Sequence, residues 1–346
     1  MLAMNIKKLV KKEVSGLQAY NAKELPCRIK LDANESPYGF SAALKAVGGL
    51  KTNRYPDPEA KTLKGLLAKD LRVGKDSILQ GNGSDELIYY LIATFGGPVL
   101  YPVPTFSMYG IIAQALGEKR IAIPLNGEFD LDLRNILSEV KSEQPKLIFL
   151  SSPNNPTGNC FSSEKMLKII ENSGCIVVVD EAYQPFASER GFLPLLKDYQ
   201  NLVIMRTLSK IGLAALRTGF LIADPLIVNE VNKVRLPFNV NSLSQAVAIA
   251  ALREKKELKS FIGQIVSERR RLFKEMAKIN GIRPYPSEAN FILFSVNDPK
   301  KAYASLLNKG ILVRNMGDAV RGCLRVTVGK PGENTAFLRA LKEIRF

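Results

Sequence analysis

Continuous apolar runs mark the middle of the chain and predict its fold. They are Leu147–Leu150, Ile176–Val179, Leu202–Met205 and Phe220–Ala223. Uninterrupted stretches of Val, Ile and Leu are typical of strands buried on both faces of a sheet, and helical patterns separate most of these runs. The pattern therefore predicts an α/β fold in which a mostly parallel sheet is covered by helices on both faces.

A polar segment follows each of the first three runs. These segments contain Asn155, Asp180 and Lys210. The carboxyl ends of parallel strands meet at one edge of a sheet, and ligands bind at that edge. We therefore expect these three side chains to lie close together.

A further turn from strand to helix is predicted near residue 81. The short apolar stretch Ile78–Gln80 runs into Gly81–Glu86, and apolar residues that begin a helix follow. Such a turn leaves free backbone amides at the helix N-terminus, where phosphate binds readily. An ordinary helix capped by Ser84 or Asp85 would give the same pattern, so the turn alone does not establish a phosphate site.

Periodicity organises the rest of the chain around this sheet. Apolar positions recur at helical spacing over residues 58–71, and a charged helix is expected over 253–278. Strands are expected at 290–294 and 324–328, and a polar helical lead over 1–30. The predicted division is an N-terminal segment (1–35) that packs with the small domain or a partner subunit, a large domain (36–255) and a small α/β domain (256–346).

The composition is that of a soluble globular protein, with 46% hydrophobic and 24% charged residues among 346. No apolar run approaches the ~20 residues that cross a bilayer. The short apolar start precedes Lys7 and Lys8, which is the wrong order for a secretory signal. We expect a cytoplasmic protein that does not enter the membrane.

The chain contains no histidine, which excludes several kinds of site. A Ser-His-Asp triad, a Cys-His dyad and an imidazole-ligated zinc all require it. The four cysteines are far apart and form no CxxC pair, so neither a disulfide framework nor a metal site is expected. Acid–base chemistry then falls to Lys, Tyr, Asp, Glu or Cys.

Lysine chemistry survives this exclusion, and Lys210 is its candidate. A lysine amine can form a Schiff base with an aldehyde cofactor, of which pyridoxal phosphate is the usual one. Thr207 and Ser209 supply hydroxyls beside Lys210, and Arg217 supplies a planar fork that suits a phosphate. Lys210 could instead be one solvated lysine among many, and this stretch by itself does not decide.

The formal net charge of +16 allows two interpretations. A basic protein can bind nucleic acid, or it can attract small phosphorylated substrates. Two of the densest basic runs, 254–259 and 268–274, mix signs at helical spacing, as solvated helix faces do. A nucleic-acid-binding protein remains the alternative from a different class, and it would carry no bound chromophore.

Nine segments together carry a family resemblance. In this order and spacing they resemble the fold-type I pyridoxal-phosphate-dependent aminotransferases, and within them the histidinol-phosphate aminotransferases. The segments are Leu31–Gly39, Arg54–Pro58, Gly81–Glu86, Pro104–Tyr109, Ser152–Gly158, Asp180–Tyr183, Thr207–Gly219, Ser287–Phe294 and Leu324–Gly329.

The resemblance implies a role for each matched residue around the cofactor ring. Lys210 would hold pyridoxal 5'-phosphate covalently, and Asp180 would pair with the pyridinium nitrogen. Asn155 and Tyr183 would bind the ring hydroxyl oxygen. Phe106 would stack on the ring, although plain core packing is an alternative for an aromatic residue.

The resemblance also implies a phosphate site and a partner. The amides of Ser84 and Asp85, with Ser209 and Arg217, would bind the cofactor phosphate. Tyr55 would reach that phosphate from the other subunit, which implies a homodimer with shared active sites.

The implied substrates are a phosphorylated amine and glutamate or 2-oxoglutarate. Arg314 and Arg325 match substrate-side arginines, and Tyr20 matches a tyrosine from the neighbouring subunit. The implied reaction is reversible transamination between L-histidinol phosphate and 2-oxoglutarate in histidine biosynthesis. A broad aromatic aminotransferase and a threonine-phosphate decarboxylase of the same fold remain open alternatives.

Overall fold

The computed structural model describes residues 5–19 and 25–344. Its larger sheet has seven strands in the order β2-β8-β7-β6-β5-β3-β4. The strands are β2 (Ile78–Gly81), β3 (Val99–Val103), β4 (Arg120–Pro124), β5 (Leu147–Ser151), β6 (Ile176–Asp180), β7 (Leu202–Thr207) and β8 (Gly219–Ala223). The strands from β7 to β4 are parallel, which confirms the mostly parallel sheet.

Strand β8 runs antiparallel to both of its neighbours, β7 and β2. The connection from β7 to β8 contains only the short 3-10 turns Ser209–Ile211 and Ala214–Leu216. A parallel return needs a crossover of a dozen or more residues, usually a helix, whereas a short connection reverses the strand. The segment that contains Lys210 is therefore a tight loop at the edge of the sheet.

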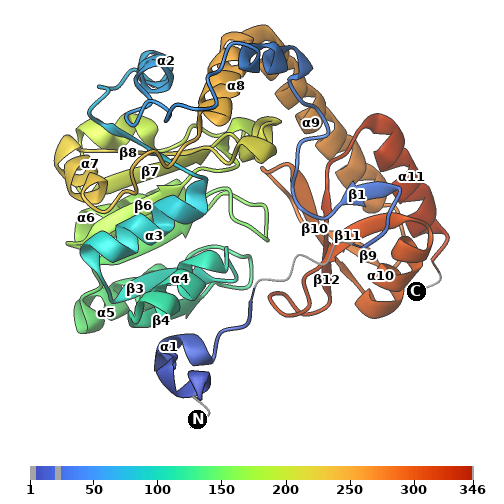
Figure 1. Ribbon diagram of the computed structural model, residues 1–346. Helices are drawn as coiled ribbons and strands as arrows, with labels where there is room; N and C mark the ends of the chain where they lie inside the picture. The colour runs from blue at the N-terminus through green and yellow to red at the C-terminus, as the bar shows by residue number, and fades with distance from the viewer. Residues whose placement is uncertain (1–4, 20–24, 345–346) are drawn as a thin grey trace.

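Helices cover both faces of the large sheet (Figure 1). On one face α3 (Ser84–Phe95), α4 (Met108–Leu116) and α7 (Pro225–Asn232) share a hydrophobic core with Val178 and Val203. On the other face Val177 and Val179 pack in a core with four further helices. These are α2 (Lys61–Leu71), α5 (Leu133–Glu143), α6 (Ser163–Asn172) and α8 (Ser242–Arg253). Burial on both faces explains why the strands read as uninterrupted apolar runs.

A second sheet of five strands has the order β1-β11-β12-β10-β9. The strands are β1 (Ile29–Leu31), β9 (Ile282–Pro284), β10 (Phe291–Val296), β11 (Ile311–Asn315) and β12 (Cys323–Thr327), accompanied by α9 (Lys255–Met276), α10 (Pro299–Asn308) and α11 (Pro331–Lys342). Figure 1 shows α9 leading from the large sheet to this layer. Strand β1 pairs in parallel with β11, so a segment near the N-terminus is part of the C-terminal layer. The predicted division at residues 35 and 255 remains a prediction.

The predicted helical lead over residues 1–30 is wrong where the structure describes it. Only a 3-10 turn (Ile6–Leu9) and one turn of helix, α1 (Lys12–Ser15), form before β1. Gly16 ends α1, and the side chain of Gln114 on α4 donates a hydrogen bond of 3.0 Å to the Glu13 carbonyl. None of the described helices is long and apolar enough to cross a membrane.

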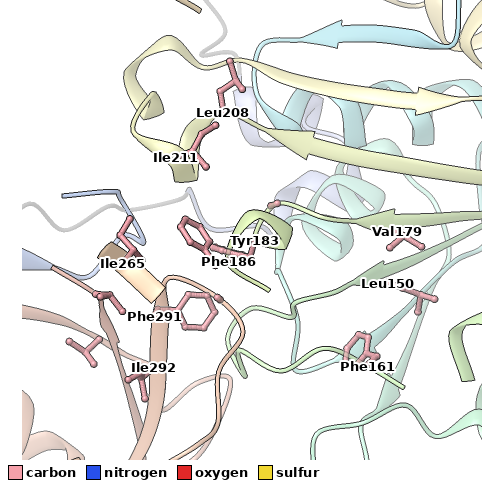
Figure 2. Packing of buried hydrophobic residues seen from close by; sticks show 14 of the residues in the cluster. Leu150, Phe161, Val179, Tyr183, Phe186, Leu208, Ile211, Ile265, Phe291 and Ile292 are labelled. Carbon is pink, nitrogen blue, oxygen red and sulfur yellow. The ribbon is translucent and has the colours of Figure 1, made fainter. Parts of the chain in front are cut away.

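The two layers meet through aromatic packing near the end of β6 (Figure 2). Tyr183 follows β6, and its ring lies edge-on to Phe291 of β10 with 5.1 Å between the centroids. Phe186, which follows Tyr183 in the chain, and Ile265 of α9 belong to the same buried cluster. The hydrophobic core is therefore continuous from one sheet to the other, directly beside the end of β6.

Candidate active site

The carboxyl ends of β5, β6 and β7 are in register, with Ser151 opposite Asp180 and Asp180 opposite Met205. A cavity of about 500 Å³ opens at this edge. Every residue predicted for the cofactor lines it except Tyr55. The lining is Ser84, Asp85, Phe106, Ser151, Asn155, Asp180, Ala182, Tyr183, Thr207, Ser209, Lys210 and Arg217.

Asp180 lies deep in this cavity and is only 3% exposed. Burial raises the pKa of its carboxyl to about 6, although hydrogen bonds from Tyr109 and from the Ala182 amide favour the charged form. The Tyr109 hydroxyl donates to Oδ2 at 2.7 Å, and the Ala182 N–H donates to Oδ1 at 3.0 Å. A cation that entered the cavity beside Asp180 would stabilise its ionised form.

Lys210 occupies the 3-10 turn that follows β7, with Nζ 5.8 Å from the centroid of the Tyr183 ring. The turn is braced by hydroxyls. Thr207 Oγ1 accepts the Ser209 N–H at 3.1 Å and donates to Ser209 Oγ at 2.9 Å. When Thr207 donates to Ser209 Oγ rather than to the Thr218 carbonyl at 3.3 Å, the Ser209 hydroxyl proton is available for an acceptor in the cavity.

The part of the cavity lined by Ser84, Asp85 and Arg217 has the features of an anion site. Helix α3 begins at Ser84, directly after Gly83, whose φ of +87° suits glycine. A Cβ at Gly83 would lie 2.8 Å from the Arg217 guanidinium, which also pairs with Asp85 at 3.2 Å. Ser84 Oγ is buried and has no hydrogen-bond partner among the described residues. Helix amides, an unsatisfied hydroxyl and a guanidinium suit a phosphate.

A second cavity of about 1090 Å³ adjoins the first and shares Lys210, Phe106, Asn155 and Tyr183 with it. Strands β1, β11 and β12 of the smaller sheet form its other side. We call this side the small-sheet wall (Lys30, Asp32, Asn34, Arg314, Arg325). The side built on the large sheet is the strand-end wall (Ser84, Asn155, Asp180, Tyr183, Ser209, Lys210, Arg217).

Arg325 is 7% exposed and joins the two walls. Its guanidinium donates to Asn155 Oδ1 at 2.5 Å and to the Asp32 carbonyl at 2.7 Å, and it lies over the ring of Phe291. Arg314 stands opposite Arg325 in the β11–β12 register. These arginines, with the lysines on either side, give the second cavity a positive character that suits an anionic ligand.

Three residues of this neighbourhood were missed by sequence reasoning as parts of the site. Tyr109 bonds to Asp180, Asn34 donates to the Tyr183 hydroxyl at 2.9 Å, and Lys30 lines the second cavity. Asn34 has φ +55°, and asparagine tolerates that conformation, so the sequence held a hint of a turn but none of the contact.

Of the predicted site residues that the structure describes, Tyr55 lines neither cavity. Tyr55 is 81% exposed and stacks on Phe238 with 4.5 Å between the ring centroids. Tyr20 lies outside the described residues.

Known proteins resemble this chain over nearly its whole length. The family model for aminotransferase class I and II matches residues 28–341. A histidinol-phosphate aminotransferase of Aquifex aeolicus is 44% identical over 97% of this chain and 98% of its own length. A relative of the same name from Nitrosococcus oceani, number 2 in that organism, is 42% identical over 96% of both.

Solved structures agree with this picture. The histidinol-phosphate aminotransferase of Sinorhizobium meliloti, in complex with pyridoxal-5'-phosphate, has a TM-score of 0.87 at 26% identity and covers 96% of both chains. The L-threonine-O-3-phosphate decarboxylase of Porphyromonas gingivalis has a TM-score of 0.80 at 23% identity over 91% of this chain and 98% of its own, which shows a shared fold alone.

Proposed function

The chain belongs to the aminotransferase class I and II family, and from this premise we propose that it is a histidinol-phosphate aminotransferase. It would transfer the amino group between L-histidinol phosphate and 2-oxoglutarate, with imidazole acetol phosphate and glutamate as the products. The observation that carries the proposal is a cavity with Lys210 and Asp180 that opens onto paired arginines, in a chain 44% identical to a relative of that name.

The strand-end wall fits pyridoxal phosphate. The unsatisfied Ser84 hydroxyl, Ser209 and Arg217 suit its phosphate, together with the amides of Ser84 and Asp85. The buried Asp180 carboxyl suits a protonated ring nitrogen, because a cation beside it would offset the cost of burying its negative charge. When bound, this cofactor supplies an aldehyde that takes up the amino group and a ring that stabilises negative charge at the substrate α-carbon.

The residues of this chain would do the rest. Lys210 would hold the cofactor aldehyde and, once displaced, its Nζ would remove the proton from the substrate α-carbon. Asp180 would keep a proton on the ring nitrogen, because an ionised carboxylate in a dry site favours a cation beside it. Phe106 would pack against the ring, and Asn155 and Tyr183 would orient the ring oxygen.

Arg314 and Arg325 would bind the substrates. An arginine fork can bind either a phosphate or a carboxylate, because both accept two parallel hydrogen bonds. One site could then receive the phosphorylated amine and glutamate in turn. The +16 net charge no longer favours a nucleic-acid-binding protein. Part of that charge lies around this cavity, and the family is one of enzymes.

A homodimer would complete the site. Tyr55 and Phe238 form an exposed aromatic pair near the exposed Leu236, and a second copy would cover this surface. Tyr55, and Tyr20 outside the described residues, would then serve the neighbouring site. Mixing Lys210→Ala chains with Tyr55→Phe chains should restore activity above the sum of the parents; activity that never exceeds that sum would argue against shared sites. The cytoplasmic location stays a prediction.

A single-turnover comparison tests the substrate. The cofactor-loaded protein is mixed with L-histidinol phosphate, phenylalanine or threonine phosphate, and the change in cofactor absorbance is followed. We expect histidinol phosphate to react most efficiently. Equal efficiency with phenylalanine would indicate a broad aromatic aminotransferase, and release of CO₂ from threonine phosphate would indicate the decarboxylase.

A further inference from the structure

Asn34 is hydrogen-bonded through its backbone and through both ends of its side-chain amide. Its N–H donates to Thr327 Oγ1 at 2.9 Å, and its C=O accepts from the Asn290 side chain at 3.0 Å. The side-chain Nδ2 donates to the Tyr183 hydroxyl at 2.9 Å. Asn34 is 2% exposed, so these contacts form away from water.

Thr327 fixes which end of the Asn34 amide faces Tyr183. Because Thr327 Oγ1 accepts the Asn34 N–H, its own proton is free to point at Asn34 Oδ1, which lies 3.3 Å away. The amide oxygen is therefore directed to Thr327, and the amide nitrogen to Tyr183.

This arrangement determines what the Tyr183 hydroxyl can do. A phenol has one proton to donate, and its oxygen accepts the proton of a donor such as Asn34 Nδ2. With Asn34 acting as the donor, the Tyr183 proton must point to some other acceptor. Tyr183 lines the cavity that also holds Lys210, so that direction is open.

We propose that Asn34 is a positioning residue for the reaction: it fixes the direction of the Tyr183 O–H, so that Tyr183 donates its hydrogen bond into the cofactor cavity. The inference rests on the proposed function, because it makes the ring oxygen of the cofactor the acceptor. It also gives the small-sheet wall a specific influence on the strand-end wall, since Thr327 of β12 orients the amide.

The test is a pH titration of the visible absorbance of the loaded protein. A hydrogen bond donated to the ring oxygen favours the form that has lost its proton. Tyr183→Phe should therefore raise the pH midpoint of the titration. Two variants probe Asn34: Asn34→Gly removes the amide and tolerates positive φ, whereas Asn34→Asp keeps the shape but offers only acceptors when ionised.

We expect both Asn34 variants to raise the midpoint, by about half a pH unit to one unit, since one hydrogen bond is at stake. Asn34→Asp should shift it at least as far as Asn34→Gly, because a carboxylate would draw the Tyr183 proton away from the cavity. In a Tyr183→Phe background, Asn34→Gly should add no further shift.

Asn334→Ala is the matched control. Asn334 is also fully buried in the small layer, where its amide bonds to both backbone groups of Gly329. Its loss should lower the thermal midpoint of unfolding and leave the pH midpoint of the absorbance unchanged.

Three results would overturn the inference. One is an unchanged pH midpoint in both Asn34 variants while Tyr183→Phe shifts it. Another is a shift by Asn34→Gly that persists in full in the Tyr183→Phe background. A raised KM for histidinol phosphate with an unchanged pH midpoint would show that Asn34 only anchors the small-sheet wall. Failure of the proposed function looks different, because histidinol phosphate would then react no more efficiently than phenylalanine or threonine phosphate with the parent protein in the single-turnover comparison.

Discussion

The two walls of the site are built in different ways. The strand-end wall comes from the ends of neighbouring strands, so the register of one sheet places Asp180 next to the strand that leads to Lys210. The small-sheet wall joins β1 to β11 and β12, which lie at the other end of the chain. Arg325 to Asn155 and Asn34 to Tyr183 are hydrogen bonds that connect the walls.

The difference separates chemistry from recognition. The strand-end wall holds a buried carboxyl, a lysine and an anion site, which are the parts needed to hold and activate a cofactor. The small-sheet wall holds paired arginines, whose forks suit anionic substrates. Changes in the first wall should therefore abolish the reaction, and changes in the second should weaken it by impairing the binding of its anionic substrates.

Of the substitutions in either wall, replacement of Lys210 should have the largest effect on kcat. Lys210→Ala should lower kcat by about 10⁴-fold, because it removes both the attachment point and the general base. Borohydride reduction and peptide mass mapping of the parent should place the phosphopyridoxyl group on Lys210. Lys233, which pairs with Glu230 on the surface, supplies the control variant Lys233→Ala. A phosphopyridoxyl group on another lysine would contradict the assignment of Lys210 as the attachment point.

Asp180→Asn is expected to cost about 10²-fold or more in kcat, since a neutral amide no longer favours a protonated ring nitrogen. Stopped-flow absorbance should show the loss in both half-reactions. A loss confined to one substrate would indicate that Asp180 recognises that substrate rather than activating the cofactor. The difference between the two walls would then not hold.

Although Asp180→Asn should impair the reaction, it should stabilise the folded, cofactor-free protein. The Asp180 pKa is raised from 3.8 to about 6 by burial, so the unfolded chain releases the proton first as pH rises. The parent therefore loses stability between about pH 4 and pH 6, by up to about 3 kcal/mol relative to Asp180→Asn. Urea denaturation of both proteins across this range measures the difference, and parallel pH profiles would contradict it.

The small-sheet wall should give a smaller, substrate-linked effect. Arg325→Ala should reduce kcat/KM for both histidinol phosphate and glutamate, because a lost charged hydrogen bond costs about 1.5–3 kcal/mol. Arg325→Lys keeps the charge without the fork and should recover part of the loss. A defect with one substrate only would show that the two substrates do not share this arginine.

Arg314→Ala should have the smallest effect, because Arg314 is half-buried and closer to solvent than Arg325. We expect KM for histidinol phosphate to rise by about tenfold, which corresponds to the lower end of the free energy of a charged hydrogen bond. KM at several ionic strengths provides the measurement. A fall in kcat at unchanged KM would place Arg314 in the chemistry instead.

The same contrast explains what the sequence could predict. Asn155, Asp180 and Lys210 each follow an apolar strand within a few residues, and local pattern was enough to bring them to one cavity. The antiparallel direction of β8 was not foreseen, although the short loop before it left no room for a crossover. The expected lead helix failed because Gly16 ends it after one turn.

The local sequence pattern could not predict contacts between segments that are far apart in the chain. The Asn34 amide meets Tyr183 only because β1 joins a sheet made from the end of the chain. Tyr109 was visible within a motif, but its bond to Asp180 depends on how α4 packs on the large sheet. The sequence therefore predicted which residues belong to the site better than it predicted which of them touch.

Because β1 pairs with strands from the end of the chain, the site can be completed only late in translation. The Asn34 N–H donates a hydrogen bond to Thr327, which lies 293 residues later in the chain. At roughly 5–20 residues per second, the ribosome needs about 15–60 s to make the intervening chain. The large sheet, with Lys210, is complete well before β12 emerges. A nascent or truncated chain can therefore present Lys210 while Arg314 and Arg325 do not yet exist. With the roles that we propose for these residues, amino transfer becomes possible only when translation is nearly finished.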